Sequence, residues 1–303
     1  MEPAEHGWID RFLSHLAHER RMSGHTIAAY RHDLLVLAEF AGRRGLTGWS
    51  AFDNSAIRTF AAAQHGAKLS PRSIQRRLSA ARTFYDFLMR EGHCARNPAL
   101  DVRAPKIKKR LPGTLDADQM GRLLSFRVDD SLSARDKAIM ELFYSSGLRL
   151  AELVGLRVAE IDLADRTVRV LGKGNKTRIV PVGRQAVDAL KRWLQERTGL
   201  AKSGVDALFV SQRGRPLSVR SVQLRVGAWG RRMGLGVHVH PHMFRHSFAT
   251  HLLESSGNLR GVQELLGHAD IGTTQIYTHL DFQHLASVYE TAHPRARRIR
   301  RSA

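Results

Sequence analysis

The chain has 303 residues, enough for two domains of ordinary size, and 43% of them are hydrophobic, so each domain can bury a core. Its 48 lysines and arginines outnumber its 28 aspartates and glutamates, and the net charge of +20 favours a polyanionic partner, nucleic acid before an anionic membrane surface. A single cysteine, Cys94, excludes an internal disulfide and a zinc site built from several cysteines, and we expect a cytoplasmic protein with neither a signal peptide nor a membrane-spanning segment.

The first hundred residues show helical periodicity four times in succession. Ser23 and the pair Ser70-Pro71 are suited to begin the second and fourth helices. The apolar positions that define the four helices are Trp8, Ile9, Phe12, Leu13 and Leu16; Ile27, Tyr30, Leu34, Leu37 and Phe40; Ile57 and Phe60, after Asn54 and Ser55; and Ile74, Leu78, Phe84 and Phe87. We expect a four-helix domain over residues 1–104, followed by a basic, proline-containing linker over residues 105–112.

The predicted fourth helix carries arginines away from its apolar face. Arg72, Arg76 and Arg77 are candidates for contact with a DNA backbone. One such arginine by itself more often belongs to a solvated helix face, but the set, taken with the net charge, favours DNA contact.

Residues 113–303 are predicted to form a second, mainly helical domain with one small antiparallel sheet. Helices are expected from Asp116 or Asp118 onward, around residues 138–143, and over residues 150–156, 185–197 and 218–233. Branched residues between turn residues predict strands over residues 161–163, 167–171 and 177–182, and a short strand over residues 208–210. The expected fold class is mainly α.

Arg149 lies at a predicted break between helices, flanked by Leu148 and Leu150. A charge among apolar neighbours needs a partner, because burying an unpaired charge is costly. Glu152 or Glu160 would make a structural ion pair, whereas a substrate phosphate would make a functional one.

The turn between the second and third strands contains Lys173. A lysine at the tip of a hairpin is usually a solvated turn residue, so Lys173 taken alone is a weak catalytic candidate. Lys176 and Arg178 nearby favour contact between this hairpin and phosphates.

The stretch from His242 to Tyr277 gathers chemically active side chains at the ends of short helices. His242 and Arg245 open a helix that Gly257 ends, a second short helix follows, and His268 comes directly after it. An arginine fork matches two phosphate oxygens, a histidine moves a proton near neutral pH, and a tyrosine hydroxyl can be a nucleophile. Together these side chains favour attack on a phosphodiester.

Other interpretations of these residues are weaker. His242 and His246 have the spacing of a zinc-binding helix, but the expected glutamate is replaced by Met243, so no metal site is predicted. The string GKGNK is too short for a nucleotide-binding phosphate loop. Tyr277 alone would more often be a packed core aromatic, and Tyr289 is the rival nucleophile.

Six residues in order resemble the active-site set of the tyrosine recombinases, the phage-integrase family: Arg149, Lys173, His242, Arg245, His268 and Tyr277. The surrounding strings GLRLAELVGL, GKGNKTR, HPHMFRHSFATHLLESSG and LLGHADIGTTQIY strengthen the resemblance, which covers essentially the whole chain. It implies a SAM-like core-binding domain over residues 1–104 and a catalytic domain over residues 113–303. Both domains would grip duplex DNA, and the reaction would need neither a metal nor ATP.

The resemblance also implies a role for each residue. Tyr277 would attack the scissile phosphate, forming a 3′-phosphotyrosyl link and freeing a 5′-hydroxyl. Arg149 and Arg245 would hold the non-bridging oxygens, and Lys173 would protonate the leaving oxygen. His242 would assist proton transfer at Tyr277, and His268 would donate a hydrogen bond to the phosphate.

Assembly is implied as well. The strings are most similar to the family members that resolve chromosome dimers at cell division. Those enzymes act with a paralogous recombinase in a heterotetramer on two DNA sites, under the control of a septal DNA translocase. A phage or integron integrase, a non-cleaving DNA-binding accessory protein and an RNA phosphodiesterase are the alternatives.

Overall fold

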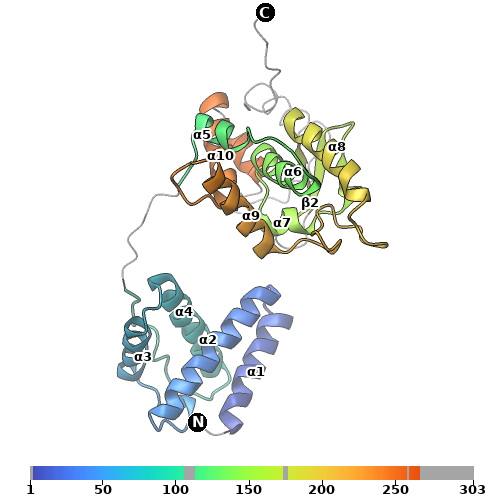
Figure 1. Ribbon diagram of the computed structural model, residues 1–303. Helices are drawn as coiled ribbons and strands as arrows, with labels where there is room; N and C mark the ends of the chain where they lie inside the picture. Colours follow the sequence, from blue (N-terminus) through green and yellow to red (C-terminus); the bar gives the residue numbers. More distant parts are fainter. Residues whose placement is uncertain (1–2, 106–112, 173–176, 258, 267–303) are drawn as a thin grey trace, which may run out of the picture. The chain divides into compact units, whose positions relative to one another are not determined.

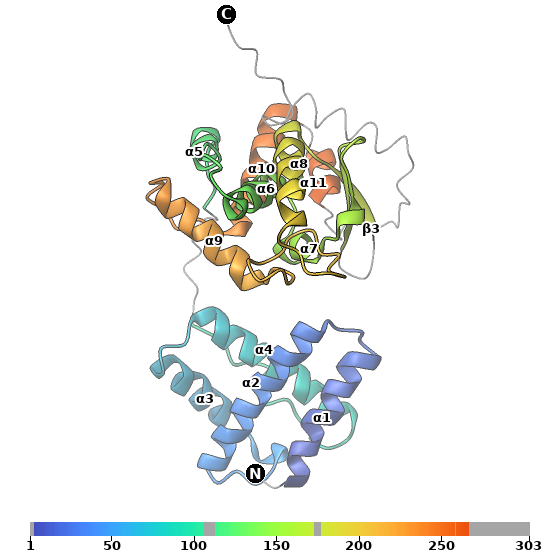
Figure 2. The ribbon, with the colours of Figure 1, turned by 45° about the vertical axis from the view of Figure 1, so that its right-hand side comes forward.

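The protein forms two compact units, Met1–Lys109 and Arg110–Ala303, each with its own hydrophobic core (Figures 1 and 2). The computed structural model describes residues 3–105, 113–172, 177–257 and 259–266. The predicted linker, residues 105–112, contains the point at which the two units divide, and all of it except residue 105 lies outside the described part of the chain.

The N-terminal unit is helical throughout. Its elements are α1 (Pro3–His18), α2 (Gly24–Arg43), η1 (Trp49–Ala51), α3 (Asn54–Gly66) and α4 (Pro71–Arg90). Ser23 and Ser70 cap α2 and α4 as predicted, each accepting a hydrogen bond at 3.2 Å from the N–H three residues on. Asp53, rather than Asn54 or Ser55, caps α3, with its carboxylate 2.7 Å from the Ala56 nitrogen.

Aromatic rings fill the core of this unit. Trp49 packs edge to face against Phe84 with 4.8 Å between ring centroids, and Phe12 packs against the same ring at 5.3 Å. Both N–H groups of Trp49 are satisfied by Glu5, through its side chain and its backbone carbonyl. The buried indole thus gains apolar area without an unpaired donor, which would otherwise cost about 1–3 kcal/mol.

The C-terminal unit is built around one helix. Its helices are α5 (Ala117–Leu123), α6 (Ser131–Ser146), α7 (Leu150–Gly155), η2 (Val158–Glu160), α8 (Arg184–Thr198), α9 (Val219–Arg232), α10 (Pro241–Ser256) and α11 (Leu259–Leu266). Nearly every residue of α6 from Ser133 onward is buried, because α8, α9, α10 and the sheet all pack against it (Figure 2). This central helix positions the residues at its own C-terminal end.

A three-stranded antiparallel sheet lies beside α6. Its strands, in spatial order, are β1 (Ile161–Asp162), β2 (Thr167–Leu171) and β3 (Thr177–Pro181). Val168, Val170 and Val180 alternate toward the core, as the period of a half-buried strand requires. The strand expected over residues 208–210 is absent from the described structure: Ala207 and Val210 form only isolated bridges, to Arg157 and Pro216.

The predicted fold class is confirmed, with helices in both units and one small antiparallel sheet in the second. Gly257 ends α10 in the left-handed conformation, and α11 occupies the place predicted for the next short helix. The further helix expected around Tyr277 lies outside the described residues. No helix in the described ranges is long and apolar enough to cross a membrane.

Candidate active site

The junction between α6 and α7 positions Arg149. Gly147 ends α6 with a φ of 57°, and a Cβ at this position would lie 2.6 Å from Phe248 Cδ1 in α10. Glycine is therefore required both by the backbone conformation and by the close approach of α10. Two buried hydroxyls tie the end of α6 to the end of β3: Ser145 accepts the Gly183 N–H at 2.6 Å, and Ser146 donates to a carbonyl of β3 at 2.8 Å.

Glu152, in the first turn of α7, is the partner of Arg149. Its carboxylate accepts the Arg149 backbone N–H at 2.8 Å and Arg149 Nη1 at 2.9 Å. Arg178 of β3 donates to the same carboxylate through both terminal nitrogens, at 2.9 and 3.0 Å. Burial alone would raise the pKa of Glu152, but the hydrogen bonds and charges of Arg178 and Arg149 outweigh it and hold that pKa below its usual range. Of the two ion pairs that the sequence left open, the structure contains the one with Glu152 rather than with Glu160.

Arg245 of α10 reaches the same junction. Its Nη1 donates to the Gly147 carbonyl and its Nη2 to the Leu266 carbonyl, both at 2.7 Å. Burial first, and then the positive charge of Arg149, lower the pKa of Arg245 to about 10, so the side chain stays a cation at neutral pH. Two neighbouring guanidinium groups repel each other unless an anion lies between them. Their forked donors suit the non-bridging oxygens of a phosphate.

Histidines surround the start of α10. His240 is its N-cap residue, and the ring centroids of His238 and His242 each lie 6.4 Å from that of His240. Partial burial lowers the pKa of His240, and the neighbouring histidines His242, His238 and His246 act in the same direction. His242 is exposed. Within the described residues, no cluster of histidine, cysteine or acidic side chains has the geometry of a metal site.

Three members of the predicted catalytic set, Lys173, His268 and Tyr277, lie outside the described residues, as does Lys176 of the predicted DNA contacts. The described chain stops on either side of Lys173 at the ends of β2 and β3, and α11 ends two residues before His268. The structure therefore brings together Arg149 and Arg245 with His242 on the same helix as Arg245. The roles of all six residues remain predictions.

The predicted DNA contacts of the N-terminal unit divide into two kinds. Arg72 and Arg76 line a concavity of about 530 Å³ between α2 and α4, together with hydroxyl and amide side chains; its lining residues are Tyr30, Ser70, Arg72, Ser73, Gln75, Arg76 and Ser79. Arg77 instead points inward, toward Gln64 and Asp33. Arg178, likewise predicted to contact DNA, is committed to Glu152. Arg77 and Arg178 thus have partners within the protein.

Two aspartates that matter here were missed in the sequence. Asp33 of α2 pairs with Arg76 and Arg77, and Asp136 of α6 pairs with Arg135 and Arg225. Burial raises the pKa of Asp33 against the opposing charges of its two arginines. The available signal was an aspartate inside an apolar helix face, which implies a buried partner.

Comparison with protein-family models decides the class of the protein. Residues 113–284 match the phage integrase family, and residues 9–92 match the N-terminal SAM-like domain of phage integrases. The chain belongs to the phage integrase family.

Individual relatives of this integrase-family chain agree. Tyrosine recombinase XerC from Pseudomonas aeruginosa is 56% identical over 291 residues, which cover 96% of this chain and 95% of the relative. Tyrosine recombinase XerC from Xanthomonas campestris pv. campestris is 52% identical over 290 residues, covering 96% and 89%. A solved structure of the XerH site-specific recombinase bound to a palindromic difH substrate shares the fold, with a TM-score of 0.72 at 23% identity over 93% of this chain and 94% of that one.

The resemblance seen in the sequence is thereby confirmed. This integrase-family protein is a tyrosine recombinase, an enzyme of site-specific DNA recombination that binds DNA sites and cleaves and rejoins them.

Proposed function

We propose that the chain works as a XerC-type recombinase whose nucleophile is Tyr277. The observation that carries this proposal is the meeting of Arg149 and Arg245 at Gly147, where Arg245 donates to the carbonyl of that glycine. A recombinase must stabilise the charge that builds on the scissile phosphate, and two guanidinium groups fixed before the substrate arrives can do so without reorganisation.

The remaining steps are assigned to the other members of the set. Tyr277 attacks phosphorus, forming a 3′-phosphotyrosyl link and releasing a 5′-oxygen, which Lys173 protonates. His242 assists removal of the proton from the Tyr277 hydroxyl, and His268 donates a hydrogen bond to the phosphate. The covalent link conserves the energy of the phosphodiester bond, so religation by another 5′-hydroxyl needs no ATP.

DNA would be held by both units. In the N-terminal unit, Arg72 and Arg76, which line the concavity between α2 and α4, are the proposed phosphate contacts, and in the C-terminal unit Lys176 is the corresponding candidate. In this proposal, Arg77 and Arg178 form ion pairs with Asp33 and Glu152 inside the protein.

The partners are proposed from the identity with XerC. A paralogous, XerD-type recombinase would complete a heterotetramer on two DNA sites, and resolve chromosome dimers at cell division in the cytoplasm, with a septal DNA translocase as regulator.

Covalent trapping tests the proposal. The protein is mixed with a nicked duplex that carries the candidate recombination site of its own chromosome, in the presence and absence of the paralogue, and then denatured. Wild-type protein is expected to give a slowed protein–DNA band, and Tyr277→Phe, which lacks the nucleophilic oxygen, is expected to give none. Tyr289→Phe, which leaves Tyr277 intact, is the matched control and should form the band.

The outcomes separate the alternatives. A band with Tyr277→Phe but not with Tyr289→Phe would move the nucleophile to Tyr289. No band with any variant, even with the paralogue, would favour an accessory DNA-binding protein on the same fold.

A further inference from the structure

Among the residues that the structure describes, three buried carboxylates each pair with two arginines. Glu152 holds Arg149 and Arg178, as described above. Asp33 and Asp136 repeat the arrangement: Asp33 pairs with Arg76 and Arg77, and Asp136 with Arg135 and Arg225. The three carboxylates are 0% to 5% exposed, so each is a buried counter-charge for its two guanidinium groups. The ion-pair distances are 2.5 to 3.0 Å except at Asp33, where Arg77 Nε lies 3.4 Å away and Oδ2 accepts no hydrogen bond.

Within every trio the two arginines differ in the same way. One is almost buried: the exposed fractions are 10% for Arg77, 4% for Arg135 and 10% for Arg178. The other is exposed over more than a third of its side chain: 45% for Arg76, 37% for Arg225 and 39% for Arg149. One carboxylate facing two guanidiniums leaves a net positive charge, and the half-exposed arginine is where an outside anion can reach it.

Ordinary surface pairs of this protein are built differently. In Arg31–Asp10 and Arg43–Glu39 both partners are more than half exposed, and one arginine faces one carboxylate. Such pairs are close to neutral and flexible, and exposed pairs contribute little to stability. The trios instead hold an arginine in one orientation, so the loss of side-chain entropy precedes the arrival of a ligand.

Two of the three half-exposed arginines were already predicted to contact phosphate on other grounds. Arg149 belongs to the set expected to hold the scissile phosphate, and Arg76 lines the basic concavity between α2 and α4. Arg225 is the third member and has no role assigned by the sequence. We propose that Arg225 contacts the phosphate backbone of duplex DNA, held in place by Asp136 in the way that Glu152 holds Arg149.

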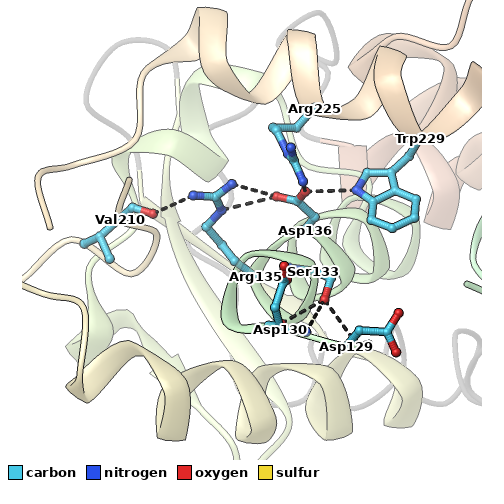
Figure 3. A network of polar contacts seen from close by, with 8 residues as sticks. All are labelled: Asp129, Asp130, Ser133, Arg135, Asp136, Val210, Arg225 and Trp229. Atoms are coloured by element: carbon cyan, nitrogen blue, oxygen red, sulfur yellow. Dashed lines mark hydrogen bonds and ion pairs between the residues drawn. The ribbon is translucent and has the colours of Figure 1, made fainter. Parts of the chain in front are cut away.

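The contacts of Arg225 leave it able to do this. Its Nε donates to Asp136 Oδ2 at 2.6 Å and its Nη2 lies 2.5 Å from the same oxygen. Nη1 has no hydrogen-bond partner among the described residues, although the charge of the nearby Asp130 carboxylate interacts with that of Arg225. Trp229 Nε1 donates to the same Asp136 Oδ2 at 2.9 Å, and Arg135 Nη2 donates to the other oxygen, Oδ1, at 2.9 Å (Figure 3). Arg135 is tied in turn to the Val210 carbonyl at 3.0 Å.

The helix that carries Arg225 is rigidly placed and strongly basic. Trp229 stacks on Phe126 with ring centroids 3.7 Å apart, and a Cβ on Gly230 would lie 2.5 Å from Val239 Cγ2, so α9 packs tightly on its neighbours. The sequence of α9, VRSVQLRVGAWGRR, contains four arginines and no acidic residue. In addition, α9 packs against α7, the helix that begins after Arg149 (Figures 1 and 2). A basic helix with no acidic residue of its own, next to the proposed phosphate site, fits a polyanion.

The test measures DNA binding as a function of salt. This inference rests on DNA binding by the family, so wild-type protein is titrated first, on a duplex carrying the candidate recombination site and on an unrelated duplex of equal length. Arg225→Ala is expected to weaken binding to both duplexes by about tenfold, since one charged hydrogen bond is lost. The slope of log affinity against log salt should fall in magnitude by about 0.9, the value of one phosphate contact.

Two further variants make the test specific. Arg225→Lys keeps the charge but not the fork, and it should retain the salt slope while binding less tightly than wild type. Arg127→Ala is the matched control, because it removes an arginine that faces one exposed aspartate, Asp129, and it should leave affinity and slope unchanged. Urea unfolding of each variant confirms that binding is measured on folded protein.

Each result bears on the proposal. Unchanged affinity and slope for folded Arg225→Ala would reduce Arg225 to a structural link between α9 and α6. A loss confined to the candidate site would show base recognition in place of phosphate contact and would also overturn it. If wild-type protein bound neither duplex, the proposed function would fail together with this inference. If wild-type protein bound and cleaved DNA and Arg225→Ala bound it equally well, only the inference would be overturned.

Discussion

At the scale of single residues, burial distinguishes two kinds of arginine: those enclosed beside a carboxylate and those that keep an exposed side. Arg178 and Arg149 share the carboxylate of Glu152, yet only Arg149 is substantially exposed. Arg178 therefore offsets the buried negative charge, so that Arg149 can face a phosphate without its charge being cancelled by its own partner. The sequence alone does not reveal this difference in exposure between the two arginines.

Glu152→Gln tests this arrangement. The amide cannot neutralise Arg178, and we expect a loss of about 1–3 kcal/mol in the free energy of unfolding. Because Arg149 also loses its fixed orientation, single-turnover cleavage should slow by at least about tenfold, as for other displaced transition-state donors. Urea denaturation and covalent-intermediate formation measure the two effects. A variant as stable and as fast as wild type would contradict the role of Glu152.

The lowered pKa of Glu152 also determines how the effect of this substitution on stability depends on pH. A carboxyl whose pKa is lower in the folded than in the unfolded state stabilises the fold above the unfolded pKa, about 4.3 for glutamate. That stabilisation is lost as the pH falls through the folded pKa. The stability difference between wild type and Glu152→Gln should thus be constant from about pH 8 to 5 and should shrink below about pH 4. A difference that grew in acid would have the wrong sign.

At the scale of elements, the active site depends on how α6 ends. Gly147 combines a left-handed backbone with a contact to Phe248 that leaves no space for a Cβ, and its carbonyl accepts Arg245 Nη1. The end of the central helix therefore sets the spacing between α7 and α10, which carry the two arginines.

Gly147→Ala should for this reason lose about 1–3 kcal/mol of unfolding free energy through backbone strain and overpacking. Cleavage should fall with it, since the Gly147 carbonyl shifts away from Arg245. Gly121→Ala is the control, because Gly121 lies within α5 with nothing near its missing Cβ, and alanine there should stabilise by up to about 1 kcal/mol. Equal stability of the two variants in urea would refute the packing argument.

At the scale of the whole molecule, the charge of +20 is distributed over two units that have separate cores. Arg76 belongs to the N-terminal unit and Arg225 to the C-terminal unit, and they share no described partner. Changes at sites without shared partners usually add. The effects of replacing the two arginines on DNA affinity and on its salt dependence should therefore add, as for two independent phosphate contacts.

The double variant Arg76→Ala/Arg225→Ala should accordingly lower the magnitude of the salt slope by about 1.8, twice the effect of either single change. Fluorescence anisotropy on the candidate duplex over a salt series measures this. Arg43→Ala on α2, which breaks an exposed pair with Glu39, is the control and should have no effect. A double variant that matched one single variant, while the other single variant bound like wild type, would mean that only one unit contacts DNA.

The sequence by itself determined the family, the fold class and most of the elements, because these depend on local information. Apolar spacing placed the helices, Ser23 and Ser70 set the starts of two of them, and six ordered residues indicated the chemistry. The prediction of a strand over residues 208–210 was wrong, because only isolated bridges, at Ala207 and Val210, pair this segment with its neighbours, without a continuous ladder.

Only the tertiary structure decided which carboxylate each arginine pairs with and how far each arginine stays exposed. The paired residues are far apart in the sequence: Arg178 and Glu152 are separated by 26 positions, Arg76 and Asp33 by 43, and Arg225 and Asp136 by 89. Periodicity can place an arginine on a helix or strand, but its partner and its exposure are fixed by which elements pack together. Burial is a property of the packed molecule rather than of any local stretch of sequence, so it could not be predicted from the sequence.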